Sequence, residues 1–164
     1  MKTRFSISQA LVLFCLAILS GLVSIAGEAT NAPTVFNASI GGFFGTSYSV
    51  ELTNNVLAYL ANRNGKVIDS ANFVPTAAKW MKFYNALDKL NVWQWHTNYV
   101  DYNVCDGTQW TFEIRNANHN LKILGSNCYP GVAGRPNWNS KKITAEFGKY
   151  LKAVGQLVGG KEFQ

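Results

Sequence analysis

Five side chains in the middle of the chain are of the types that bind metal ions or transfer protons. They are His96, Asp101, Cys105, Asp106 and His119. None of them stands at the spacing of a zinc motif, and the sequence has no His-x-x-x-His pair. Residues 101–107 are similar to a calcium-binding loop, but the glycine comes one residue late and Phe112 stands where the last glutamate ligand belongs. We therefore expect no bound metal and no cofactor.

Catalysis by side chains alone finds little support in the sequence. There is no Gly-x-Ser-x-Gly motif for a serine nucleophile. Hydrolysis by paired carboxylates needs two acids that face one cleft. Asp101, Asp106 and Glu113 form the only close group of acids, and the strand pattern points Glu113 outward. A hydrolase that uses Asp101, Asp106 or His96 is the alternative to a protein that binds its partner without catalysis.

Aromatic and amide side chains in the second half of the chain favour binding. Trp80 and Trp110 already fill the expected core, so other aromatic residues are free to be exposed. Exposed aromatic rings beside amides can stack on sugar rings and hydrogen-bond their hydroxyls. We expect a surface for a glycan or protein partner built from Trp95, Tyr99, Tyr102 and Trp138, with Gln94 beside them. The alternative is that these aromatics seal the edge of a small core beneath long loops.

The first 26 residues have the pattern of an export leader. Lys2 and Arg4 precede an almost unbroken apolar stretch from Ala10 to Val23, and small residues then allow cleavage after Ala26. The apolar stretch is short for a membrane span, which needs about 20 residues. We expect a secreted or periplasmic protein with no stable membrane span, and an uncleaved anchor is the alternative.

Charge and export together narrow the class of partner. The formal net charge of +6 falls to +4 once the two basic leader residues are removed. An exported protein seldom meets nucleic acid, so we expect a monomer that binds a protein or glycan outside the cytoplasm.

Cleavage would leave two of the three cysteines, Cys105 and Cys128. In an oxidising compartment two remaining cysteines most simply form one disulfide. A reactive thiol or a metal site is the rival interpretation.

Hydrophobic periodicity indicates the elements of the first half. Residues 27–38 have no periodicity and are expected to be a polar lead-in. Larger residues alternate with small or polar ones from Phe44 to Leu52, which predicts a half-buried strand. If residues 56–60 return from a turn centred on Asn54, Val50 faces Ala58. Residues 62–72 are polar and are expected to form a connection with a second turn.

The second half is predicted from the same patterns. Thr76 is a plausible N-cap for an amphipathic helix that ends near Asn91, and residues 92–96 suggest a short extended segment. Strands at residues 110–114 and 121–124 pair with Ile114 opposite Ile123. A final helix is capped by Asn139 or Ser140, and its inner face carries Ile143, Phe147, Tyr150 or Leu151, Val154 and Leu157.

These elements give the order β-β-α-(β)-β-β-α. We predict a single α+β domain over residues 39–164, with a mainly antiparallel sheet of four to five strands and two helices packed on one face. In this arrangement Cys105 and Cys128 lie just past the open ends of the second hairpin.

Short motifs in the first strand resemble those of a family of small exported bacterial domains of unknown function. The motifs are Phe44-Gly45-Thr46 and, after it, Tyr48-Ser49-Val50. The element order and Asp106-Gly107-Thr108 before a later strand are also similar, from about Ile40 to Leu157. The resemblance implies the fold and export, and it implies no activity.

One departure from that family affects its sulfur chemistry. Cysteines often flank the Phe-Gly-Thr element in the family, whereas Phe43 and Ser47 stand there in this chain. A role that depends on those thiols is therefore not implied here.

Overall fold

The computed structural model describes residues 32–103, 106–138 and 142–164. Its centre is a seven-stranded sheet in the order β4-β3-β2-β1-β6-β7-β5, in which β5 and β7 pair in parallel and all other neighbours are antiparallel. The strands are β1 (Val35–Gly41), β2 (Thr46–Thr53), β3 (Val56–Arg63), β4 (Lys66–Phe73), β5 (Asn98–Val100), β6 (Gln109–Arg115) and β7 (Asn120–Ser126). The helices are α1 (Ala77–Lys89) and α2 (Ala145–Leu157), with the short 3-10 helices η1 (Val92–Gln94) and η2 (Val132–Gly134).

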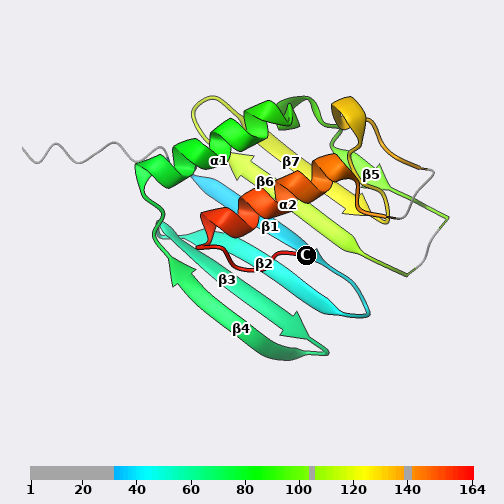
Figure 1. Ribbon diagram of the computed structural model, residues 1–164, viewed down its shortest axis with the longest axis horizontal. Coiled ribbons are helices and arrows are strands. Elements are labelled where there is room, and N and C mark those ends of the chain that lie inside the picture. The colour runs from blue at the N-terminus through cyan, green and yellow to red at the C-terminus, as the bar shows by residue number, and fades with distance from the viewer. Residues whose placement is uncertain (1–31, 104–105, 139–141) are drawn as a thin grey trace, which may run out of the picture.

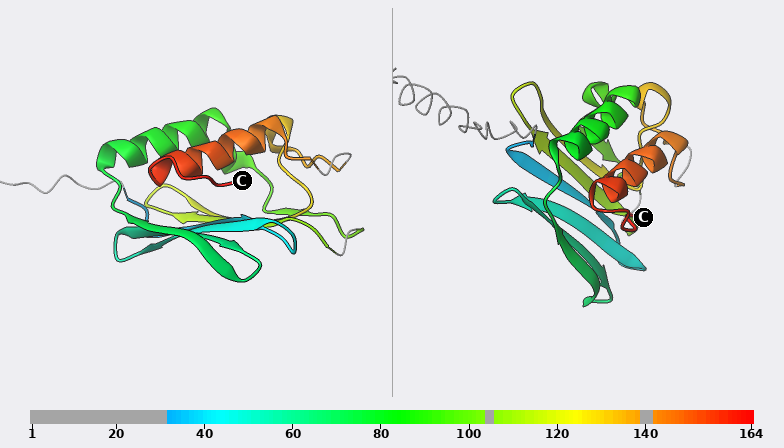
Figure 2. Two further views of the ribbon diagram at one scale, coloured as in Figure 1. Left: turned by 60° about the horizontal axis from the view of Figure 1, so that its bottom comes forward. Right: turned by 60° about the vertical axis from the view of Figure 1, so that its left-hand side comes forward.

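Both long helices lie on the same face of the sheet (Figures 1 and 2). This confirms the α+β class and the mainly antiparallel sheet. The number of strands is seven rather than the four to five expected. The opposite face of the sheet is covered by no helix of the described residues (Figure 2). No helix among these residues is long and apolar enough to cross a membrane.

The central strand, β1, begins inside the segment expected to be a polar lead-in. Phe36, Ala38 and Ile40 alternate with half-buried neighbours and are buried against the helices. The small side chain of Ala38 weakens the alternating pattern in the sequence. β1 pairs with β2 on one side and β6 on the other, so the lead-in boundary at residue 38 divides a strand that holds the sheet together.

The first hairpin forms with a register one residue away from the expected one. Asn54 and Asn55 both have positive φ, 51° and 64°, as a two-residue type I′ turn requires. Val50 therefore faces Tyr59 rather than Ala58. The prediction centred the turn on one residue, and because side chains alternate, a one-residue shift exchanges the two faces of β3.

The polar segment after the hairpin forms the edge strand β4 instead of a connection. Its turn at Asn64-Gly65 was predicted and is present, with φ values of 52° and 77°. An edge strand without a helix above it can be polar on both faces, so hydrophobic alternation did not reveal it.

A threonine caps the N-terminus of each long helix. Thr76 caps α1 as predicted, and its hydroxyl accepts from the backbone N–H of Lys79 at 3.3 Å. Thr144 caps α2 by accepting from the N–H of Phe147 at 3.1 Å, whereas Asn139 and Ser140, which were expected to do so, lie outside the described residues. Both helices bury most of their predicted apolar face, and α2 buries Tyr150 and Leu151 together. Ile143, which was expected on the inner face of the final helix, lies before α2 begins and is 42% exposed.

Candidate functional site

The structure separates the four aromatic residues that were expected to form one binding surface. Trp95 is 4% exposed and Tyr99 is fully buried, whereas Tyr102 is 82% exposed and Trp138 is 57% exposed. The expected surface is therefore wrong for Trp95 and Tyr99, which belong to the core. The interpretation that aromatics seal the edge of the core describes these two correctly.

The residues around Trp95 explain its burial. The segment expected to be extended is the 3-10 turn η1, which brings the indole ring next to Tyr150 of α2 at 5.8 Å between ring centroids. The backbone of Gly134 packs against the same ring, and Gly134 adopts a φ of 71° there. The Tyr99 hydroxyl donates to the carbonyl of Gly134 and accepts from the N–H of His96 at 3.0 Å. These contacts join η1, η2 and β5.

Burial of tyrosine hydroxyls should make the fold sensitive to alkali. Burial raises the pKa of Tyr99 to about 12, and that of Tyr59 to about 12, from an ordinary value of 10.0. The unfolded chain therefore releases these protons first as the pH rises. Each of the two tyrosines should reduce the free energy of unfolding by about 1.4 kcal/mol per pH unit between pH 10 and 12, with no effect below pH 10.

Urea titrations at a series of alkaline pH values measure this loss, and tyrosinate absorbance shows when ionisation occurs. In Tyr99→Phe the slope of stability against pH should be smaller by one tyrosine's share, even though the variant is less stable at neutral pH. An unchanged slope would show that Tyr99 does not ionise on unfolding as described.

The described residues include only one of the two cysteines of the candidate disulfide. Cys128 follows β7 and is buried, and burial raises the pKa of its thiol. Cys105 lies outside the described residues, so its pairing with Cys128 stays a prediction.

The residues considered for catalysis and metal binding do not come together. Asp101 accepts hydrogen bonds from the backbone and side chain of Asn103 within its own turn, at 3.0 and 3.1 Å. His96 is exposed, whereas the ring of His119, in the turn between β6 and β7, stacks on Trp93. Among the described residues there is no group of three or more His, Cys, Asp or Glu that could hold a metal ion. Asp106 is the exception in position, because it borders the hollow described next.

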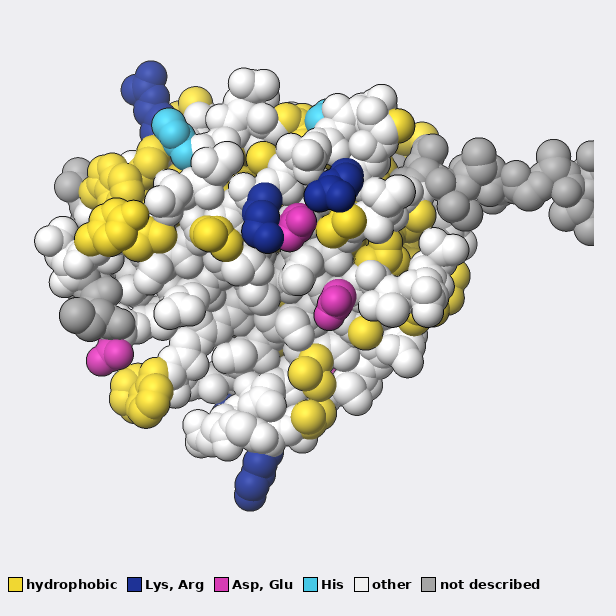
Figure 3. Space-filling view, turned by 180° about the vertical axis from the view of Figure 1, so that it is seen from behind, with side chains coloured by type: hydrophobic (Ala, Val, Ile, Leu, Met, Phe, Trp, Pro, Cys, Tyr) yellow, Lys and Arg dark blue, Asp and Glu magenta, His cyan; other side chains and the backbone are white. Residues whose placement is uncertain are grey.

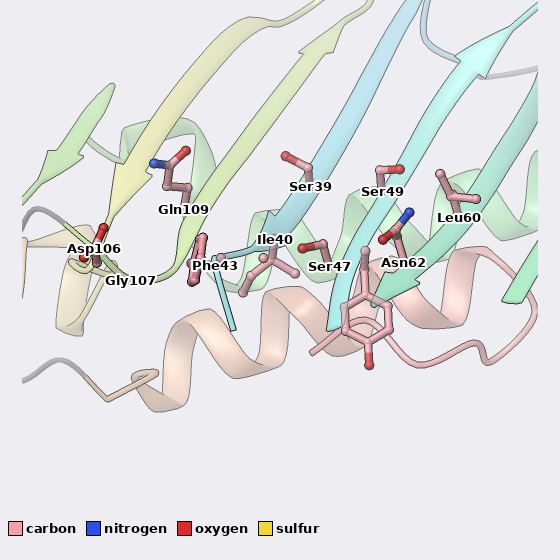
Figure 4. A pocket seen from close by; sticks show the side chains of 13 residues that line it. Ser39, Ile40, Phe43, Ser47, Ser49, Leu60, Asn62, Asp106, Gly107 and Gln109 are labelled. Atoms are coloured by element: carbon pink, nitrogen blue, oxygen red, sulfur yellow. The ribbon is translucent and has the colours of Figure 1, made fainter. Parts of the chain in front are cut away.

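The open face of the sheet carries a broad hollow of about 630 Å³. Figure 3 shows this face, which is mostly backbone and uncharged polar side chains. Figure 4 shows Ser39, Ser47 and Ser49 on the neighbouring strands β1 and β2, with Gln109 on one side and Asn62 on the other. We call this feature the serine hollow.

Strand register explains why these small side chains gather. Ser39 pairs with Ser49 across β1 and β2 and with Thr111 across β1 and β6, so three adjacent strands carry small hydroxylated side chains side by side at this point. The hydroxyls of Ser39 and Thr111 lie 2.7 Å apart and form a hydrogen bond. Ser47 pairs with Asn62 of β3, which extends the same polar face outward.

An exposed aromatic pair stands at the end of the serine hollow. Phe43 and Phe44 occupy the β1–β2 turn at 80% and 85% exposure, and their rings meet edge to face at 4.9 Å between centroids. Phe44 was expected to begin the buried face of a strand, but the strand starts only at Thr46. Gly42 approaches the backbone of Gly107, which fixes the turn beside the β6 strand. Of the two rings, Phe43 lines the hollow.

The charge in the serine hollow differs from that of the whole chain. Asp106 is its one charged lining residue in the part of the chain that the structure describes, although the full chain has a net charge of +6. Glu113 and Lys122, on the same open face, neutralise each other in an ion pair at 3.0 Å. An anionic ligand would therefore find no lysine or arginine among the described residues that line the hollow.

Sequence reasoning missed the serine hollow because it treated Ser47 and Ser49 as the outward spacers of a strand. The available signal was that Ser47 and Ser49, two successive outward positions of β2, are both small and hydroxylated, as is Ser39 in β1.

Comparison of the chain with protein-family models, with curated proteins and with solved structures found no match.

Proposed function

We propose that this protein is a non-catalytic binding domain that acts outside the cytoplasm and takes a neutral glycan in the serine hollow. The observation that carries the proposal is the hollow itself: a wide depression lined by hydroxyl and amide groups together with Ile40 and Leu60, with an exposed phenylalanine at one end. Its volume of about 630 Å³ lies within the usual range for ligand sites and has room for a few sugar rings.

The lining groups match the chemistry of sugars. A sugar hydroxyl both donates and accepts, and so do serine hydroxyls and the amides of Asn62 and Gln109. The apolar face of a sugar ring needs a flat partner, and Phe43 offers one at 80% exposure. The sheet holds the hydrogen-bonding groups in fixed positions, which reduces the entropy lost on binding.

Charge favours a neutral glycan over an acidic one. A uronic acid or phosphate polymer would place its charges near Asp106, with no cation among the described lining residues to balance them. A protein partner would use the same face, and the experiment below separates the two.

Of the three residues considered for a hydrolase, only Asp106 lies at the hollow. Asp106 borders the hollow, but Asp101 is held in its own turn by Asn103. Hydrolysis by paired carboxylates needs a second acid at about 5 to 9.5 Å. Asp106 is the one acid among the described lining residues, so binding without cleavage is the better match.

Substitution of Phe43 tests the proposal. On an array of neutral and acidic oligosaccharides, the purified protein should bind neutral chains, and Phe43→Ala should weaken this binding about 10-fold through loss of the stacking surface. Tyr102→Ala is the matched control, because Tyr102 is an equally exposed aromatic outside the hollow.

The proposal would be contradicted by three results. Binding restricted to acidic chains would show that the hollow does not select neutral glycans. Release of shorter sugars would show that the protein is a hydrolase. A failure to bind any sugar, with capture of a protein partner that is lost in Phe43→Ala, would assign the face to protein recognition.

A further inference from the structure

A second hollow, of about 380 Å³, lies at the opposite end of β6 from the serine hollow. It is formed where the last turns of α1, the 3-10 helix η1 and the β6–β7 turn meet. Its principal lining side chains are Met81, Tyr84, Asp88, Trp93, Asn116 and His119. We call it the tryptophan pocket, and nothing in the proposed function uses it.

Hydrogen bonds and ring stacking fix the walls of the tryptophan pocket. The indole Nε1 of Trp93 donates to Oδ1 of Asp88 at 2.5 Å, which ties η1 to the end of α1. The His119 ring stacks on Trp93 at 3.7 Å between centroids and 11° between planes. The side-chain oxygen of Asn116 accepts from the backbone N–H groups of Asn118 and His119 at 2.8 and 2.7 Å, which sets the turn that carries the histidine. The pocket is therefore built before any ligand arrives.

The pocket has one charge and several aromatic surfaces. Asp88 is the one charged lining residue in the described part of the chain, and its second oxygen, Oδ2, accepts no hydrogen bond from described residues. Tyr84, Trp93 and His119 supply rings, and Met81 is 49% exposed at the wall. The buried Nδ1 of His119 has no partner among the described residues, although buried polar atoms normally have one.

A free carboxylate oxygen beside aromatic rings selects an organic cation. An ammonium group donates up to three hydrogen bonds, and aromatic rings attract a nearby cation while the alkyl part packs on apolar surface. From this arrangement we infer that the tryptophan pocket binds a small alkylammonium compound, with its charged nitrogen at Asp88 and its carbon chain toward Met81 and Tyr84.

Calorimetric titration of the purified protein with n-butylammonium, and with the uncharged 1-butanol of the same chain length, tests the inference. The amine should bind and the alcohol should bind at least about 10-fold more weakly, because only the amine carries a charge. Asp88→Asn keeps an oxygen for the Trp93 N–H and removes the negative charge, so it should weaken amine binding about 10-fold and leave alcohol binding unchanged.

Glu51→Gln is the matched control, since it removes one negative charge from the exposed end of β2, outside this pocket. It should bind the amine like the original protein. Equal binding of amine and alcohol by the original protein would overturn the inference, and that comparison stands even if Asp88→Asn fails to fold. Unchanged amine binding by a folded Asp88→Asn protein would overturn it as well.

Discussion

Replacement of Ser49 by tyrosine is expected to weaken glycan binding about 100-fold or more while the protein stays folded. Ser49 lies at the centre of the serine hollow, with Ser39 on one side and Leu60 on the other. A tyrosine ring there would occupy the volume that the sugar needs. Tyrosine is well suited to a strand and the position faces the uncovered side of the sheet, so the core is untouched.

Glu51→Tyr provides the matched control for this substitution. Glu51 is two residues further along β2, faces the same side and lies outside the serine hollow. It receives the same ring without filling the hollow, so binding should stay within about 2-fold of the original value. Binding is measured by calorimetry with the sugar selected on the array. If the Ser49→Tyr protein binds this sugar as tightly as the original protein does, the serine hollow is not the binding site.

The largest effect on stability is expected from Gly125→Ala in β7. Gly125 is paired with Trp110, which is 1% exposed and whose indole N–H donates to the carbonyl of Cys128 at 3.0 Å. A Cβ atom at this position would lie 2.6 Å from the indole Cζ2 and still closer to the nitrogen side of the ring. The tryptophan cannot retreat, because Phe147 packs against it at 4.5 Å between ring centroids.

We expect this alanine to reduce the free energy of unfolding by about 3 kcal/mol, the upper part of the usual range for overpacking. Gly148→Ala is the opposite case, since its Cβ would lie at an ordinary 3.8 Å from Ile143 and would favour the α2 helix. It should stabilise the protein by about 0.5 kcal/mol. Urea denaturation of the three proteins measures both changes, and a Gly125→Ala protein as stable as the original would show that the Trp110 contact is wrong.

Local patterns were enough to predict the elements that bury one clear apolar face. Helix α1, its Thr76 cap and the inner face of α2 follow from helical spacing, because one stripe of each helix packs on the sheet. The second hairpin forms with Ile114 opposite Leu121 rather than Ile123. This shift of two residues leaves Ile114 and Ile123 on the buried face. The predicted buried faces of both strands are therefore right, although the predicted register is wrong.

The missed strands share a physical cause. β4 is an edge strand with mixed polarity, and β1 has the small Ala38 in its buried row, so neither shows strong alternation in the sequence. Their positions depend on long-range pairing, which no local window contains. β5 was also not predicted, because its three residues are held by parallel pairing with the distant strand β7.

The candidate site was harder to predict than the fold. The predicted site was built from large aromatic residues. Trp95 and Tyr99 are instead held in the core by contacts with η2 and α2, which are distant in sequence. The serine hollow instead depends on which small residues become neighbours across three strands. Ser39 meets Ser49 and Thr111 only once the sheet order is known, and that order was not available from periodicity.

The most direct test of the account is to locate the bound sugar on the folded protein. Backbone amide signals can be followed by nuclear magnetic resonance while the protein is titrated with a neutral oligosaccharide chosen from the array. The largest shifts should fall on the backbone amides of Ser39, Ser47, Ser49 and Gln109, with little change in α1 and α2. Shifts confined to the helical face or to the loops that carry Tyr102 and Trp138 would contradict it.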